Sequence, residues 1–238
     1  MRRRSLALGL PVAALAAVSS AAALAGTSPA PPCEPDGSVT LAETSTARVY
    51  QIERRRDGRA TLYTYGCLRS TGNQLLLASD AEPSALFPRP AISLVGPYVG
   101  YGVDTDTDTS SPGGRITYVE VDDLRPQQPG QETAGLVVSA GPRDVARVGS
   151  LKVSSTGAVV WISCPAPSDG PLASDPSGSC TRPGAHDRVY RAKLGRSGLA
   201  NVALLDKGTS IDPHSLHRAR HSSVTWRHGR TTFVAKLR

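Results

Sequence analysis

The sequence predicts an all-β protein built from antiparallel four-stranded meanders, and two observations support this. From Ser38 onward, short runs rich in Val, Ile, Leu, Thr and Tyr alternate with clusters of Gly, Pro, Asp and Ser. This texture is typical of strands separated by turns. No stretch of a dozen residues repeats apolar side chains at the 3.6-residue period of a helix.

The predicted strands group into four successive sets. The first set comprises residues 38–43, 47–53, 60–68 and 74–78. The second comprises residues 91–95, 98–103, 115–121 and 135–139. The third comprises residues 150–154, 158–163, 188–194 and 201–205. The last contains residues 215–219, 223–226 and 231–237.

Turn residues separate these strands. Ser155-Thr156-Gly157 and Gly195-Arg196-Ser197-Gly198 predict tight turns in the third set. The densest charge cluster, Glu53-Arg54-Arg55-Arg56-Asp57, is also predicted to be a turn. By contrast, residues 158–162 are apolar at every position, which is typical of a strand covered on both faces.

Each set carries an aromatic residue at a similar place in its second strand. These residues are Tyr50, Tyr101, Trp161 and Trp226, spaced 51, 60 and 65 residues apart. A four-stranded meander repeated at a loose period of this kind is typical of the blades of a β-propeller.

The phrase Ser154-Ser155-Thr156-Gly157, placed before an apolar strand that ends in Trp161, resembles the repeat of TolB-type, WD40-like propellers. It departs from that repeat at Thr156, where an aspartate usually stands. The resemblance extends over most of residues 38–238 and implies about four blades, in a closed ring or a partial propeller. A β-sandwich is the alternative, because strands at this spacing suit it as well.

The N-terminus predicts export. Three arginines at positions 2–4 precede an apolar run, Leu6 to Ala17, and the small residues Ala23-Leu24-Ala25 offer a cleavage site. This order is that of a secretory signal peptide, and the run falls short of the roughly 20 residues of a spanning helix. We therefore expect a signal peptide over 1–25, a Pro-rich leader over 26–37 and one domain over 38–238. The mature chain is expected to be extracellular, without a transmembrane segment.

Four cysteines in an exported chain favour disulfides. The pairing Cys33–Cys67 with Cys164–Cys180 encloses the shortest loops and is the one we predict. A zinc site built from the four thiolates is the rival interpretation. No C-x-x-C pair supports it, so the disulfides are favoured.

Asp104, Asp106 and Asp108 alternate in a segment that resembles the start of a calcium loop. Thr109, however, stands where an EF-hand turn requires glycine, and Arg115 stands where its closing glutamate belongs. A solvated hairpin loop is therefore favoured over calcium, and we expect no metal and no cofactor.

Other sequence motifs for catalysis are incomplete. His214, His217, His221 and His228 gather near the C-terminus, and polar positions on strands and turns explain them better than zinc. No Gly-x-Ser-x-Gly elbow occurs. Asp122 and Asp123 are adjacent, and neighbouring residues of a strand point to opposite faces, so the two are not expected to share a substrate.

The formal charge of +7 includes three arginines of the predicted signal peptide, and the remaining charges are interleaved. No basic stripe or aromatic RNA-binding motif occurs, so we expect no nucleic-acid partner.

The favoured function is a secreted, non-catalytic module that binds a protein, glycan or cell-envelope component. An extracellular glycoside hydrolase is the alternative, although aromatic residues make up only 5% of the chain. A third hypothesis is a half-propeller that acts as a homodimer.

Overall fold

The computed structural model describes residues 33–80, 91–106, 115–126, 146–165, 187–195, 198–219 and 222–237. These residues form fourteen strands in four antiparallel sheets, and no helix occurs among them. The first sheet contains β1 (Val39–Glu43), β2 (Ala47–Arg56), β3 (Arg59–Leu68) and β4 (Asn73–Asp80). The second contains β5 (Ile92–Val95), β6 (Tyr98–Asp106) and β7 (Arg115–Asp123). The third contains β8 (Ala146–Val153), β9 (Val159–Pro165), β10 (Asp187–Gly195) and β11 (Gly198–Gly208). The fourth contains β12 (His217–Ala219), β13 (Ser223–His228) and β14 (Thr231–Lys236).

In every sheet the strands lie in the order in which the chain makes them, so each sheet is a meander. This confirms the all-β class and the grouping of the strands into four sets. The strand predicted at residues 135–139 lies outside the described residues, as do residues 1–32, which include the predicted signal peptide. Within the described ranges, no helix is long and apolar enough to span a bilayer.

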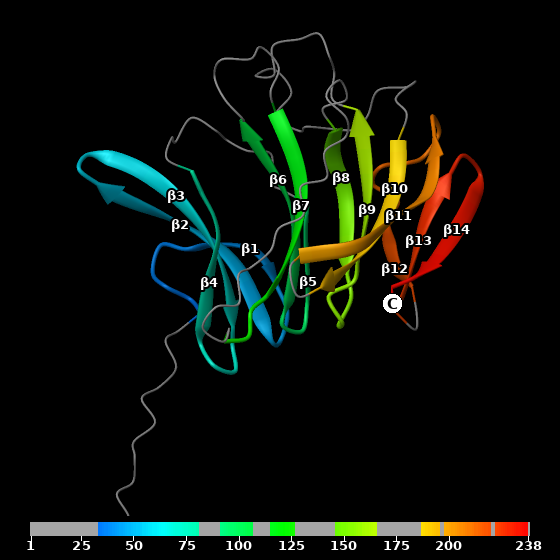
Figure 1. The fold of residues 1–238 in the computed structure, drawn as a ribbon. Helices are drawn as coiled ribbons and strands as arrows, with labels where there is room; N and C mark the ends of the chain where they lie inside the picture. Colours follow the sequence, from blue (N-terminus) through cyan, green and yellow to red (C-terminus); the bar gives the residue numbers. More distant parts are fainter. Residues whose placement is uncertain are drawn as a thin grey trace, which may run out of the picture.

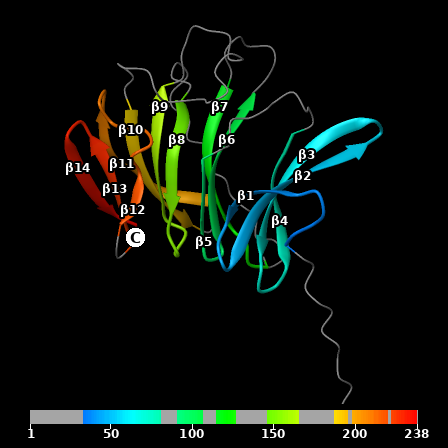
Figure 2. The same cartoon turned by 180° about the vertical axis from the view of Figure 1, so that it is seen from behind.

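The four sheets stand side by side in an open arc, from β1–β4 at one end to β12–β14 at the other (Figures 1 and 2). One buried apolar cluster lies between the first and second sheets, a second between the second and third, and a third between the third and fourth. Each internal face is therefore covered by a neighbouring sheet, as in the blades of a partial propeller. Among the described residues no apolar cluster joins the fourth sheet back to the first.

The prediction of a turn over residues 53–57 was wrong. Residues 53–56 belong to β2, and the hairpin turns at Asp57 and Gly58, whose φ angles are 52° and 79°. Two consecutive positive φ angles define the type I′ turn that Asp-Gly favours. The charged residues before it extend the strand instead of ending it, and the β2–β3 hairpin projects from the arc (Figures 1 and 2).

The tight turn predicted at residues 155–157 is confirmed. The Ser154 hydroxyl accepts hydrogen bonds from the backbone N–H groups of Thr156 and Ala158, at 3.2 and 3.0 Å. Gly157 adopts a φ of 76°, which a side chain would strain. The turn thus returns the chain into β9, whose residues 159–162 are fully buried or nearly so.

The first two sheets lie close together at Gly66 of β3. A Cβ atom added at Gly66 would lie 2.5 Å from a methyl carbon of Leu124, a residue with 0% exposure. Two hydrogen bonds hold the backbone of Leu124. Its N–H donates to Pro97 O at 2.8 Å, and its carbonyl accepts from the Asn73 side-chain amide at 2.7 Å. Only glycine leaves room for this contact.

The aromatic residue predicted on the second strand of each set is buried in all four sheets. The exposed fractions are 1% for Tyr50, 5% for Tyr101, 1% for Trp161 and 3% for Trp226. In three sheets this residue stacks on its cross-strand neighbour. The pairs are Tyr50–Tyr65 at 5.6 Å, Trp161–Tyr190 at 5.3 Å and Trp226–Phe233 at 5.7 Å between ring centroids.

These aromatic residues all face the same way along the arc. Tyr101, Trp161 and Trp226 each pack in the cluster shared with the preceding sheet. Tyr50 occupies the equivalent place in the first sheet, where no preceding sheet is described. Among the described residues no other sheet packs on this side of the first sheet, although Cys33 contacts Tyr50 there.

Candidate recognition surface

The face of the first sheet on which no described sheet packs carries tyrosine and arginine side chains from β2 and β3. Side chains alternate along each strand, and the register pairs Tyr50 with Tyr65 and Arg54 with Thr61, so these positions share one face. We call the following residues the tyrosine–arginine face: Arg48, Tyr50, Arg54, Arg59, Tyr63 and Tyr65.

The three rings of this face form a stack. Tyr65 lies 5.6 Å from Tyr50 and 6.3 Å from Tyr63 between ring centroids, with interplanar angles of 24° and 27°. The guanidinium carbon of Arg54 lies 5.8 Å from the Tyr63 centroid and 5.7 Å from that of Tyr65, within cation–π range. Because the ring faces are turned towards one another, ring edges, phenol hydroxyls and the guanidinium are the groups left for a ligand.

The phenol hydroxyls of this face are free to bond a ligand. None of the hydroxyls of Tyr50, Tyr63 and Tyr65 has a hydrogen-bond partner among the described residues. Burial raises the pKa of Tyr50, the neighbouring Tyr65 raises it further, and Arg54 with Arg48 acts in the opposite direction. The Tyr50 phenol therefore keeps its proton at neutral pH.

Arg48 is a buried cation held by neutral groups. It is 6% exposed, donates to Cys33 O at 2.7 Å, and makes bonds of 2.9 and 2.6 Å to the Thr40 hydroxyl. Its guanidinium carbon lies 5.3 Å from the centroid of the Tyr50 ring. No carboxylate in the described part of the chain forms an ion pair with it. A buried charge bonded only to neutral groups is costly, and an added anion would offset part of that cost.

A disulfide holds one end of the face. Cys33 and Cys67 are bonded, with their Cα atoms 5.6 Å apart, which confirms the first predicted pair. Both are buried and pack with Tyr50, Ile52 and Tyr65. The bridge therefore ties Cys33, which also accepts the Arg48 hydrogen bond, to β3. Cys180 lies outside the described residues, so the pairing of Cys164 with it stays a prediction.

The second sheet brings two carboxyl groups together on a different face. In place of a stacked aromatic partner, Tyr101 has Glu120 opposite it across the strands. Its hydroxyl lies 2.5 Å from Glu120 Oε2, 2.8 Å from Asp122 Oδ2 and 3.2 Å from Leu77 O. Asp123 points elsewhere and pairs with Arg125, so the expectation that Asp122 and Asp123 do not share a site is confirmed.

A proton shared within this acid cluster would balance its hydrogen bonds. A tyrosine hydroxyl donates one hydrogen, yet three acceptors surround that of Tyr101. Protonation of one carboxyl supplies the missing donor. Burial raises the pKa of Asp122 to about 6, the Tyr101 hydrogen bond lowers it, and the Glu120 charge raises it. Tyr101 and Asp122 are only 5% and 6% exposed and lie between the first two sheets, whereas Glu120 is partly exposed.

The predicted calcium candidates are only partly described. Asp104 and Asp106 belong to β6, where they pair with Thr117 and Arg115, so the strand extends beyond its predicted end at Val103. Asp108 lies outside the described residues. Within the described ranges, no group of three or more His, Cys, Asp or Glu residues could hold a metal ion. The preference for a hairpin loop over calcium stays a prediction.

The C-terminal histidines that the structure describes do not form a metal-binding group. His228 Nδ1 lies 3.1 Å from both carboxylate oxygens of Asp206, whose Oδ2 also accepts from Trp226 Nε1 at 2.8 Å. This network joins the third sheet to the fourth. His217 lies on β12, His214 in the preceding turn, and His221 outside the described residues.

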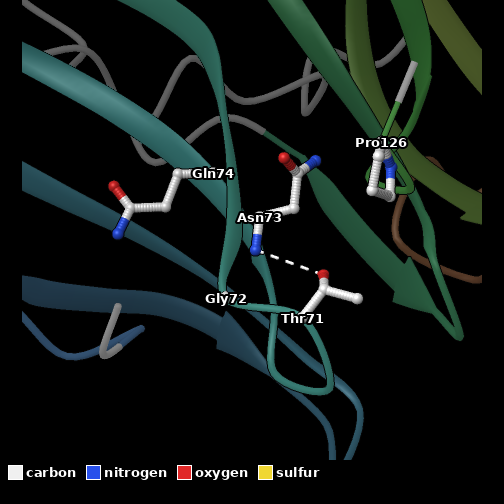
Figure 3. Close-up of a pocket in the computed structure, with 5 residues that line it drawn as sticks. All are labelled: Thr71, Gly72, Asn73, Gln74 and Pro126. Carbon is white, nitrogen blue, oxygen red and sulfur yellow. Dashed lines mark hydrogen bonds between the residues drawn. The ribbon is translucent and has the colours of Figure 1, made fainter. Parts of the chain in front are cut away.

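Two hollows lie at the turn end of the first sheet. One of about 440 Å³ is lined by Thr71, Gly72, Asn73, Gln74 and Pro126, and Figure 3 shows the Asn73 N–H donating to the Thr71 hydroxyl at 3.2 Å. The other, of about 490 Å³, is lined by residues 43–45 and Arg69.

The polar groups of both hollows serve the fold. The Asn73 amide donates to Leu124 O. Arg69 forms ion pairs of 3.0 Å with Glu34 and 3.1 Å with Glu43. Neither hollow combines a set of donors without protein partners in the way that the tyrosine–arginine face does.

Sequence reasoning missed both side-chain clusters, although each has a signal at two-residue spacing. Tyr63 and Tyr65 alternate in β3, and Glu120 and Asp122 alternate in β7, so each pair shares a face. The cross-strand partners Tyr50 and Tyr101 depend on register, which the sequence leaves open.

No protein-family model matches the chain, and no curated protein sequence is significantly similar to it.

Proposed function

We propose that the protein is a secreted, non-catalytic module built of TolB-type, propeller-like blades, and that it binds an extracellular glycan through the tyrosine–arginine face. One observation carries the proposal. No described sheet packs on this face, which is the counterpart of the faces that meet inside the arc, and the phenol hydroxyls and the guanidinium groups of Arg54 and Arg59 have no hydrogen-bond partner among the described residues. A ligand rich in hydroxyl and carbonyl oxygens would satisfy those donors.

The opposite end of the arc differs in chemistry. The free face of the fourth sheet carries alternate residues of β13 and β14, namely Thr225, Arg227, Thr232, Val234 and Lys236. Of its two charged side chains, Arg227 pairs with Asp212 and Lys236 is exposed, and among the described residues Val234, at 65% exposure, is its large exposed apolar residue. Two copies joined end to end would set Lys236 against Arg54 and Arg59, which disfavours a second copy as the ligand.

The hydrolase alternative gains less support. Glycoside hydrolysis needs two carboxyl groups that flank a sugar bond. Glu120 and Asp122 are the one pair of acids that converge on a shared hydroxyl within the described residues, and Asp122 and Tyr101 are buried between sheets. The positions of Glu120, Asp122 and Tyr101 therefore fit a role in sheet packing and proton binding better than a catalytic role.

The test is affinity electrophoresis of the mature protein in gels containing a panel of neutral and acidic polysaccharides. We expect at least one polymer to retard the wild type and Tyr63→Ala to reduce that retardation. Phe233→Ala is the matched control, because it removes a partly exposed ring from the fourth sheet. The absence of retardation in every gel, or equal loss in both variants, would contradict the proposal.

A further inference from the structure

We propose that the glycan bound by the tyrosine–arginine face is an acidic polysaccharide whose carboxylates meet Arg54 and Arg59; this deepens, and rests on, the proposed function. The guanidinium groups of Arg54 and Arg59 each have five hydrogen-bond donors and no acceptor. The hydroxyls of Tyr63 and Tyr65, which can donate or accept, have no partners among the described residues. A ligand that pairs with both arginines must therefore supply acceptors.

The charges of the face are also unbalanced. Arg54 and Arg59 are exposed, and neither forms an ion pair among the described residues. No position that β2 or β3 contributes to this face is an acid, whereas Arg55, on the other side of β2, pairs with Glu53 at 3.0 Å. Arginine binds carboxylates through paired hydrogen bonds that are stronger than bonds between neutral groups. The unpaired arginines therefore favour an anionic ligand over a neutral one.

The shape of the face favours an extended chain. Arg59 and Tyr65 are six residues apart on β3 and neither is buried, so the accessible part of the face runs along the strands for roughly 20 Å at about 3.3 Å per residue. An extended sheet surface of this kind suits a polymer better than a single sugar.

An acidic protein is a weaker fit for the same surface. The centre of a protein interface is depleted in charge and more apolar than the rest of the surface. Here arginine and phenol donors dominate, and Leu76, at 48% exposure, is the large exposed apolar residue next to them.

Polygalacturonate is the test polymer, and its carboxyl-reduced form is the matched control because it keeps the backbone and loses the charge. We expect the mature protein to bind polygalacturonate at least about tenfold more tightly than the reduced polymer. We also expect this binding to weaken several-fold between 50 and 200 mM salt, since screening acts on exposed charges. Isothermal titration calorimetry would give both quantities.

Two neighbouring arginines provide a matched pair of variants. Arg54→Gln removes a guanidinium from the face, and Arg55→Gln removes one from the opposite side of the same strand. We expect Arg54→Gln to weaken binding to polygalacturonate about tenfold, in line with the loss of a charge-assisted hydrogen bond. Arg55→Gln should change it less than twofold. Thermal melting of both variants verifies that the fold is retained.

The outcomes separate the inference from the proposed function. Equal binding of the charged and reduced polymers overturns the acidic ligand and leaves glycan binding in place. Binding to a phosphate-bearing polymer but not to polygalacturonate also overturns it. If no polymer binds, and sizing chromatography shows a dimer that Arg54→Gln dissociates, both proposals fail and a second copy occupies the face.

Discussion

The Tyr50–Tyr65 pair of the first sheet and the Trp161–Tyr190 pair of the third have the same place in their blades and different surroundings. Both are cross-strand pairs of the second and third strands, and both stack with an interplanar angle of 24°. Trp161 lies in the apolar cluster shared with the second sheet. Tyr50 packs with a disulfide and Tyr65, beneath the guanidinium of Arg48.

The comparison shows that the same aromatic pair packs between two sheets in the third sheet and lies on a face without a neighbouring described sheet in the first. Within the arc, the aromatic pair contributes to packing between sheets. At the first sheet no preceding sheet is described. There Tyr50 contacts the Cys33–Cys67 bridge, Arg48 and the stacked Tyr65 ring. The account therefore predicts that the inner pair acts mainly on stability and the outer face mainly on binding.

The largest expected effect is on the inner pair. Trp161→Ala should lower the free energy of unfolding by about 3–5 kcal/mol, because it leaves a cavity between two sheets. Tyr63→Ala, on the uncovered face, should cost less than about 1 kcal/mol, since the site borders solvent. Urea unfolding followed by circular dichroism would measure both. Similar losses in the two variants would remove the distinction between inner and outer faces.

Removal of the Cys33–Cys67 disulfide tests how much this bridge stabilises the side of the first sheet on which no described sheet packs. Cys33→Ser with Cys67→Ser should destabilise the protein by about 4 kcal/mol, because the bridge closes a loop of 34 residues. It should also expose Tyr50, which chemical nitration of tyrosines followed by mass spectrometry would detect. A double variant in which Tyr50 stays unreactive would show that the bridge does not cover the pair.

Substitutions at Gly66 and Thr61 compare the two faces of β3. Gly66→Ala should cost about 1–3 kcal/mol, because the new methyl group overlaps Leu124 between the first two sheets. Thr61→Ala, on the uncovered face of the same strand, should leave the melting temperature within a few degrees of wild type. The comparison fails if Gly66→Ala melts like the wild type.

The second sheet, which has an acid pair in place of a stacked ring, predicts a dependence on pH. The pKa of Asp122 is about 6 in the folded protein, against 3.8 for the ordinary group. The native state then binds more protons between these values, so this contribution is fully present below pH 4 and is lost as pH rises through 6.

Asp122→Asn isolates that contribution, because an amide can donate to Tyr101 as a protonated carboxyl does. We expect the wild type to lose roughly 2 kcal/mol relative to Asp122→Asn between pH 4 and pH 7. Urea unfolding at several pH values would measure the difference. Parallel pH profiles for the two proteins would show that Asp122 does not carry the shared proton.

The strands were predictable from the sequence and the surfaces were not. Alternating apolar runs and turn residues located every strand that the described residues contain. The Glu53–Arg56 segment was misassigned, because its charges obscured the Asp57-Gly58 turn that extends the hairpin. The tyrosine–arginine face depends on register, which local patterns do not specify. It also depends on which blade face is left uncovered, and the order of sheets along the arc decides that.

The most direct test is hydroxyl-radical footprinting of the mature protein with and without the polysaccharide that retards it most strongly in gels. Bound ligand should lower the oxidation of Tyr63 and Tyr65 and leave that of Phe233 unchanged. Protection of Phe233, with Tyr63 and Tyr65 as reactive as in the free protein, would place the ligand at the other end of the arc and contradict the account.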